Sequence, residues 1–400
     1  MAQTAAHLVD YVIPHVPVRL WVLSLPMPLR LLLAAQPKLA TPVLQVVHGA
    51  IKRHLLGQAG LEADQADCGA VTLIQRFGSA ANLNIHLHRV VLVGVYRPGT
   101  HGAPGFLKLP APTNEALQTM LHKIISRMMK MLTRRGVLVE EEGSTCMAFM
   151  ANNDGDADEA RVLRPLRAAA CTYRIASGPR AGQKVLTLQG AMLREKDSKQ
   201  TLCADIDGFS LHAAVRCGVD DRQALEQLRR YTTRPALAKE RKQTNTAGQK
   251  LLKLKTARRD GTTHLVMSPL EFMQRLAALV LGPRLHFPRF HGVLAPSSTT
   301  SAKLHAQVLP QVPESPTRAE QPAECEANCA HHRPVRLSWA KLLKRVFEID
   351  LEHCPNCGGE LKIIVVILEQ PVIEKVLTRL GLQARAPPRA PAGGQALHAA

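Results

Sequence analysis

The sequence predicts an α+β fold in which an antiparallel sheet is flanked by helices, and two observations carry this prediction. Runs of strand length, rich in Val, Ile and Leu, lie at residues 18–25, 70–77 and 84–96. One helix-like stretch precedes the run at 70–77, and another follows the run at 84–96. The second and third runs are joined by a short turn of small and polar residues at 78–82, as in an antiparallel hairpin.

Prolines separate the first elements of the chain. The strand over 18–25 is ended by Pro26 and Pro28, because a proline nitrogen has no hydrogen to donate to a sheet. The helix expected over 29–56 should break near 37–42, where two further prolines stand.

The helix over 117–132 is the clearest in the sequence. Its apolar residues recur at helical spacing, Thr113 is a suitable N-cap, and Gly136 follows two arginines at the end. We interpret this apolar face as core packing. The remaining elements are expected to be a helix over 220–230, a basic hairpin over 251–267 and a short amphipathic helix over 269–280.

Length and composition favour more than one folded part. A chain of 400 residues exceeds one typical domain, and 46% hydrophobic residues are enough for a core. A stretch rich in Ser, Pro, Ala and Glu is typical of a flexible linker. The expected organisation is a main region over 1–296 with a helical insertion at about 112–165, a linker over 297–334, a small module over 335–385 and a disordered tail over 386–400.

The charge balance favours a polyanionic partner. Lys and Arg number 51 against 32 Asp and Glu, which gives a formal net charge of +19 and attracts phosphate-rich partners through counterion release. A merely soluble basic protein and a protein of anionic membrane surfaces are the alternatives. No apolar stretch reaches the length of a membrane span, and there is no signal-peptide pattern, so we expect a cytoplasmic protein with reduced thiols.

His86 and His88 are candidate metal ligands. They stand two residues apart in the strand over 84–96, so both side chains project from one face of the strand and Leu87 projects from the other. Two imidazoles on one rigid face can chelate a divalent cation through their neutral nitrogens. Two exposed histidines on an edge strand are the commoner explanation of this pattern when it stands alone.

Tyr231 is a candidate nucleophile. It closes the helix over 220–230 and stands among Arg229, Arg230 and Arg234. A free phenol ionises near pH ~10, and neighbouring cations favour the phenolate, which suits attack on a phosphodiester while the arginines hold the DNA backbone. On the local sequence alone, a tyrosine packing its ring beside solvated arginines is the favoured interpretation.

Cys354 and Cys357 form a CxxC motif followed by two glycines, which is half of a zinc site. A small turn with two free thiols explains the same motif. The candidates for the other half of a zinc ribbon are Cys325, Cys329, His331, His332 and His353.

Three segments, at 73–96, 229–241 and 260–275, together resemble the rolling-circle insertion-sequence transposases of the HUH endonuclease superfamily. The resemblance runs from near the start of the chain to about residue 382, and the order and spacing of the three segments are specific. It implies an HUH-type antiparallel sheet flanked by helices in the catalytic region over 1–296, with the CxxC in a small C-terminal module.

The resemblance also implies a mechanism. His86 and His88 are similar to the pair that binds Mg or Mn, and Tyr231 matches the nucleophile that joins a DNA 5′ phosphate and releases a 3′ hydroxyl. Members of the superfamily complete the metal site with a third ligand, for which Gln75 is the candidate here. The expected substrate is single-stranded DNA at the ends of a mobile element, without a membrane partner.

The chain departs from its relatives at several places. Gln227 stands where many have a second tyrosine, which places the chain with the single-tyrosine branch, and Val93 stands where an acidic residue is usual. Relatives begin with a cysteine-rich zinc domain, and this chain resembles the part that follows it. The open alternatives are a non-catalytic DNA-binding remnant, a plasmid replication initiator or relaxase, and an unrelated metal-dependent hydrolase that does not need Tyr231.

Overall fold

The structure is a computed structural model that forms two compact units, Val9–Val312 and Met1–Leu8 with Pro313–Ala400. Each unit is considered by itself. The residues that the structure describes are 2–99, 102–141, 144–147, 157–189, 202–233, 237, 241–255, 257–258, 260–279, 288–296, 305, 307–310, 338–353, 357–361 and 369–379.

An antiparallel sheet forms the centre of the larger unit. Its strand order is β15-β2-β3-β1-β10-β9, and β11 also pairs with β1. This arrangement, with helices packed on the sheet, confirms the α+β prediction. The strands are β1 (Val18–Ser24), β2 (Gly69–Phe77), β3 (Leu83–Leu92), β9 (Cys203–Ile206), β10 (Phe209–His212), β11 (Arg216–Cys217) and β15 (Arg289–Gly292).

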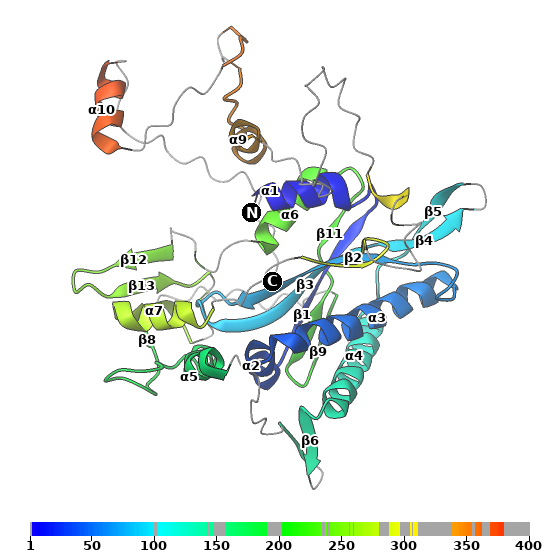
Figure 1. Cartoon of the computed structure of the whole chain (residues 1–400), viewed down its shortest axis with the longest axis horizontal. Helices are drawn as coiled ribbons and strands as arrows, with labels where there is room; N and C mark the ends of the chain where they lie inside the picture. Colours follow the sequence, from blue (N-terminus) through cyan, green and yellow to red (C-terminus); the bar gives the residue numbers. More distant parts are fainter. Residues whose placement is uncertain are drawn as a thin grey trace, which may run out of the picture. The chain divides into compact units, whose positions relative to one another are not determined.

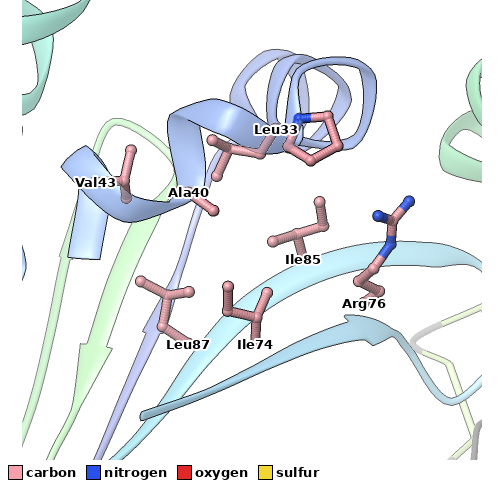
Figure 2. Close-up of a pocket in the computed structure, with 8 residues that line it drawn as sticks. Leu33, Ala40, Val43, Ile74, Arg76, Ile85 and Leu87 are labelled. Atoms are coloured by element: carbon pink, nitrogen blue, oxygen red, sulfur yellow. The ribbon is translucent and has the colours of Figure 1, made fainter. Parts of the chain in front are cut away.

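Three helices cover one face of this sheet, namely α2 (Met27–Ala35), α3 (Ala40–Ala59) and α4 (Asn114–Arg134). Figure 2 shows Ile74, Ile85 and Leu87 of the sheet opposite Leu33 and Val43 of α2 and α3, around a small apolar pocket. Helix α6 (Arg222–Thr232) lies on the other side of the sheet (Figure 1). The apolar side of β3 is therefore buried against α2 and α3, as the sequence pattern predicts.

The helix predictions hold closely. A short 3-10 turn, η2 (Pro37–Leu39), separates α2 from α3 where the break was expected. Thr113 caps α4 as predicted, because its Oγ1 accepts a hydrogen bond from the Ala116 amide at 3.1 Å. The apolar face of α4 is buried in the largest core cluster.

The strand expected over 84–96 is divided in two. The chain leaves β3 after Leu92 and continues as β4 (Gly94–Gly99), which pairs with β5 (Gly102–Lys108). A Cβ added to Gly94 would lie 2.3 Å from the Leu107 carbonyl oxygen, so the chain can approach its new partner there only without a side chain. Because both parts have strand periodicity, the change of partner is invisible in the pattern of apolar residues.

A second antiparallel sheet has the strand order β12-β13-β14-β8. It contains the predicted hairpin that turns at Gly261, with one further strand on each side. The strands are β8 (Leu186–Gln189), β12 (Lys242–Thr244), β13 (Lys250–Lys253) and β14 (Thr262–Met267).

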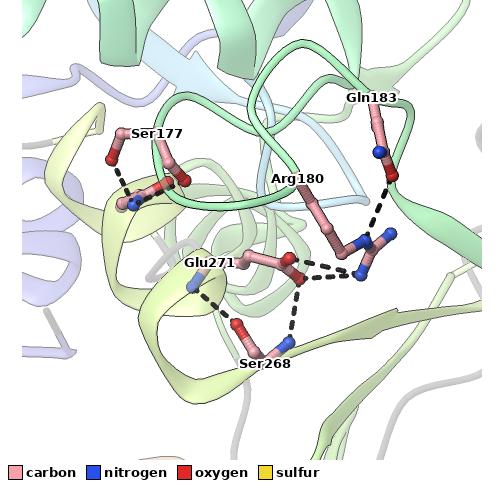
Figure 3. Close-up of polar contacts among 6 residues, drawn as sticks. Ser177, Arg180, Gln183, Ser268 and Glu271 are labelled. Carbon is pink, nitrogen blue, oxygen red and sulfur yellow. Dashed lines mark hydrogen bonds and ion pairs between the residues drawn. The ribbon is translucent and has the colours of Figure 1, made fainter.

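Helix α7 (Pro269–Ala277) follows β14 and is fixed at its start by polar contacts (Figure 3). Ser268 and Glu271 form a capping box, in which each side chain accepts a hydrogen bond from the backbone amide of the other. The Arg180 guanidinium pairs with the Glu271 carboxylate at 3.2 Å. These contacts hold the loop around Arg180 against α7.

The other elements of the larger unit are η1 (Leu8–Val12) from Val9 onward, β6 (Leu138–Glu141), β7 (Ser144–Met147) and α5 (Ala157–Thr172). The smaller unit contains α1 (Ala2–His7), α9 (Trp339–Phe347) and α10 (Gln370–Arg379). Most of the expected linker and all of the expected tail fall outside the described residues. Among the helices that the structure describes, none combines the length and the apolar character needed to cross a bilayer.

Candidate active site

The two histidines lie on an interior strand. His86 of β3 stands opposite Ser24 of β1 and Gln75 of β2, so β3 has hydrogen-bonded neighbours on both sides. Leu87 faces the helices, and the rings of His86 and His88 lie together on the other face with centroids 4.7 Å apart. His88 is only 4% exposed and His86 is half-buried. This placement excludes the exposed edge strand as the reason for the pair.

Gln75 lies directly beside His86. Its Oε1 is 2.8 Å from Nε2 of His86, and its side chain is buried. The other ring nitrogen of His86, Nδ1, is 2.8 Å from the carbonyl oxygen of Asn84. Both contacted oxygens only accept hydrogen bonds, so the neutral ring, which has one N–H, can donate to Asn84 or to Gln75 but not to both.

Tyr231 is brought to the histidines by helix α6. Leu225, Leu228 and Thr232 are buried at helical spacing and anchor the helix. Tyr231, in the last turn, is half-buried, and its ring centroid lies 6.4 Å from that of His88. The tyrosine and the histidine pair are distant in sequence, so this approach is a product of the fold.

The first residue of α6 fixes the start of the helix. The Arg222 guanidinium donates hydrogen bonds to the backbone carbonyls of Val9, Ile13 and Pro14, at 2.8 Å for Ile13 and 3.1 Å for Pro14. These carbonyls belong to the segment that leads into β1, which pairs with the histidine strand. Arg222 therefore links the position of α6 to that of the sheet.

Lys255 is a site residue that the sequence reasoning missed. Its Nζ donates a hydrogen bond to the Tyr231 hydroxyl at 3.3 Å and lies 4.7 Å from the centre of the ring. Lys255 follows β13 and is exposed. The only sequence signal was the basic character of the hairpin over 251–267, which did not distinguish this lysine from its neighbours.

The three arginines around Tyr231 differ in their surroundings. Arg229 is 0% exposed, and burial lowers the pKa of its guanidinium to about 10. This burial contradicts the expectation that Arg229 lies on a DNA-contacting surface. Arg229 follows Leu225 by four residues, so it falls on the buried face of α6. Arg230 is half-buried and 3.9 Å from the Glu226 carboxylate, and Arg234 lies outside the described residues.

The family described as Putative transposase matches residues 69–302, a stretch that includes both histidines, Tyr231 and Lys255. The match covers more than half of the 400 residues. The chain belongs to this transposase family. No curated protein and no solved structure matches the chain at a significant level.

The histidine site of this transposase brings together two imidazoles and one amide oxygen, which are groups that can ligate a divalent cation. An octahedral ion with ligands at about 2.1 Å brings neighbouring ligand atoms about 3 Å apart, close to the 2.8 Å between Gln75 Oε1 and His86 Nε2. Metal-binding histidines usually donate their other ring N–H to a carbonyl, and Nδ1 of His86 lies 2.8 Å from the Asn84 carbonyl oxygen. The described residues contain no cluster of three or more His, Cys, Asp and Glu suited to a metal ion. Further ligands would therefore be Gln75, water or DNA phosphate.

The zinc prediction for the transposase falls largely outside the described residues. Cys354 is outside them, and so are Cys325, Cys329, His331 and His332. Cys357 is exposed and has a free thiol, and the His353 ring contacts the Asp350 carboxylate at 3.2 Å. A zinc ribbon at Cys354 and Cys357 stays a prediction.

Proposed function

We propose that the protein is an HUH-type transposase that nicks single-stranded DNA and transfers the cut strand, with Tyr231 as its single nucleophile. The observation that carries the proposal is the approach of the Tyr231 ring to within 6.4 Å of His88. Gln75 of β2 contacts His86 on the same face of the sheet, and Lys255 donates a hydrogen bond to the Tyr231 hydroxyl. Packing alone does not require these five polar side chains to converge.

The Tyr231 oxygen attacks the phosphorus of a DNA phosphodiester. A bond forms between this oxygen and phosphorus, and the bond from phosphorus to the 3′ oxygen breaks. The electron pair leaves with the 3′ oxygen, which takes up a proton and becomes a 3′ hydroxyl, while the phenol proton passes to solvent. The 5′ phosphate stays joined to Tyr231, so the energy of the broken bond is kept for joining to another 3′ hydroxyl.

Lys255 stabilises the attacking oxygen. Its ammonium is 3.3 Å from the Tyr231 hydroxyl and offsets the negative charge that develops there when the proton leaves. Arg230, in the same turn of α6 and 3.9 Å from the Glu226 carboxylate, would contact the phosphate backbone beside the cut. Gln227, one turn earlier, cannot act as a second nucleophile, so each chain forms one covalent link.

His86, His88 and Gln75 would hold a divalent cation such as Mg or Mn, which when bound polarises the phosphate and offsets its charge. With its proton on Nδ1, the His86 ring would donate to the Asn84 carbonyl and leave the Nε2 lone pair for the cation. Gln75 is held by its place on β2 directly opposite His86.

Two alternatives are less well supported. The interpretation as a hydrolase that does not use Tyr231 does not explain why Tyr231 and Lys255 lie beside the histidines. A replication initiator or relaxase shares the chemistry, and the transposase family match favours the transposase over both.

The test uses single strands that tile both flanks of the protein's own coding sequence, mixed with random-sequence single strands; this mixture is called the strand pool below. With Mg or Mn, the protein should cut the pool and form a band that resists denaturation. Tyr231→Phe should abolish both products and keep DNA affinity within about twofold, because only one oxygen is lost. Cleavage that persists in Tyr231→Phe would show that Tyr231 is not the nucleophile and would refute the proposal.

A further inference from the structure

A basic groove lies between α3 and α4, in the helical layer across the sheet from Tyr231. Figure 1 shows these two helices side by side. Its uncharged lining residues are Pro42, Gln45, Val46, Gly49 and Met131. Its charged residues are Arg53 of α3, Arg127, Lys130 and Arg134 of α4, and Arg135 at the end of α4. No acidic side chain is among the described residues that line it.

The cations on α4 form one continuous row. Arg127, Lys130 and Arg134 are spaced by three and four residues, so they share one side of the helix, and the exposed Lys123 extends the row by another turn. At 1.5 Å per residue the row from Lys123 to Arg134 is about 16 Å long. The buried face of α4 is turned to the core, so this row is held on a rigid helix.

Two details indicate that the groove is adapted to an anion. Nη1 of Arg127 is buried and has no hydrogen-bond acceptor among the described residues. The Arg53 guanidinium lies over Gly49, where an added Cβ would come 3.3 Å from one of its nitrogens. Like charges held together repel each other, and an anion that neutralises them and accepts their hydrogen bonds is favoured.

The lining also distinguishes between kinds of DNA. Single-stranded DNA sites combine positive charge with aromatic side chains on which the bases stack, and none of the described residues that line this groove is aromatic. Duplex DNA presents a regular row of phosphates with its bases stacked inside, and needs only charge and length. A free phosphate would not use cations spread over about 16 Å.

We propose that the α3–α4 groove binds the phosphate backbone of duplex DNA, as a second DNA site separate from the strand-cutting site. The histidines and Tyr231 lie on the far side of the sheet, so one protein molecule can hold a duplex in the groove while a single strand is cut at Tyr231. The inference rests on the groove and on the family's action on DNA. It does not depend on Tyr231 being the nucleophile.

The test compares two double variants of equal charge change. Lys130→Gln/Arg134→Gln removes two exposed cations from the groove, and Arg97→Gln/Lys108→Gln removes two exposed cations from the β4–β5 hairpin. Affinity for a random-sequence duplex is measured by fluorescence anisotropy over a salt series. The groove variant should flatten the slope of log affinity against log salt by about 1 to 2 units, and the hairpin variant should leave it unchanged.

Single-strand binding separates this proposal from the proposed function. The groove variant should keep its affinity for the strand pool and its rate of covalent adduct formation, and Tyr231→Phe should keep duplex affinity. Equal slopes for the two double variants would overturn the proposal, and so would a matching loss of single-strand affinity. If the groove variant kept its duplex affinity but no longer bound vesicles of anionic lipid, the proposal would be overturned and the groove would be assigned to membranes instead.

Discussion

Replacing Lys255 by Gln should slow covalent adduct formation roughly 10- to 100-fold. Its Nζ lies 3.3 Å from the Tyr231 hydroxyl. Opposite unit charges at that distance attract by about 1.3 kcal/mol in water and by about 5 kcal/mol at an effective dielectric constant of about 20. Lys255 is exposed and the oxygen carries only part of a charge in the transition state, so we expect about 1.4 to 2.7 kcal/mol.

The assay is a single-turnover measurement with saturating strand pool, followed as the denaturation-resistant band over time. Lys253→Gln is the matched control, because Lys253 is an exposed lysine on the preceding strand and is not in contact with Tyr231 through any described hydrogen bond. The control should react at the wild-type rate. Equal rates for the two variants, or a fall in Lys255→Gln explained wholly by weaker DNA binding, would refute the reasoning.

Three further predictions concern buried polar residues. Arg229→Met should raise the free energy of unfolding, measured in urea, by about 1 to 3 kcal/mol, and a loss of stability would contradict the account. Arg229→Met should also leave the slope of log DNA affinity against log salt unchanged, whereas Arg230→Gln should flatten this slope by about one unit. Burial lowers the pKa of His48 to about 2 and of His291 to about 3. Below about pH 6.5 the unfolded chain therefore binds protons that the native state does not, so the free energy of unfolding should fall as the pH drops from 6.5 towards 4.5. His291→Gln should reduce the slope of the free energy of unfolding against pH by up to about 1.4 kcal/mol per pH unit, and an unchanged slope would contradict the account. Gln75→Ala should weaken Mn binding, measured by calorimetry, about 10-fold or more, and unchanged binding would remove Gln75 from the ligand set.

The histidine strand shows how far the sequence could be taken. Alternation along a strand has a period of two, so placing His86 and His88 on one face and Leu87 on the other needed only the sequence. Whether the strand is interior or at an edge was not decided by this pattern, and the pairing of β3 with both β1 and β2 shows that it is interior.

Arg229 could have been placed correctly from its spacing. It is four residues after Leu225, on the buried face of α6, but its charge and its nearness to Tyr231 suggested a surface role. Helical periodicity was the better guide here, because the packing of Leu225 and Leu228 sets the orientation of the whole helix.

The meeting of Tyr231, His88 and Lys255 could not be derived from local pattern. These residues come from α6, β3 and the end of β13, and their distances depend on how separate elements pack. Only the resemblance to a family predicted that two of them, His88 and Tyr231, belong to one site. Lys255 carried no distinguishing pattern, since one lysine in a basic hairpin is chemically like the next.

The central claim is tested most directly by identifying the residue that carries DNA after reaction with the strand pool. Digestion of the adduct by nuclease and protease, followed by mass spectrometry, should find a nucleotide on the peptide that contains Tyr231. Tyr96, which is 6% exposed, is an internal comparison and should stay unmodified. A nucleotide on another residue, or cleavage of the pool without any covalent adduct, would contradict the account.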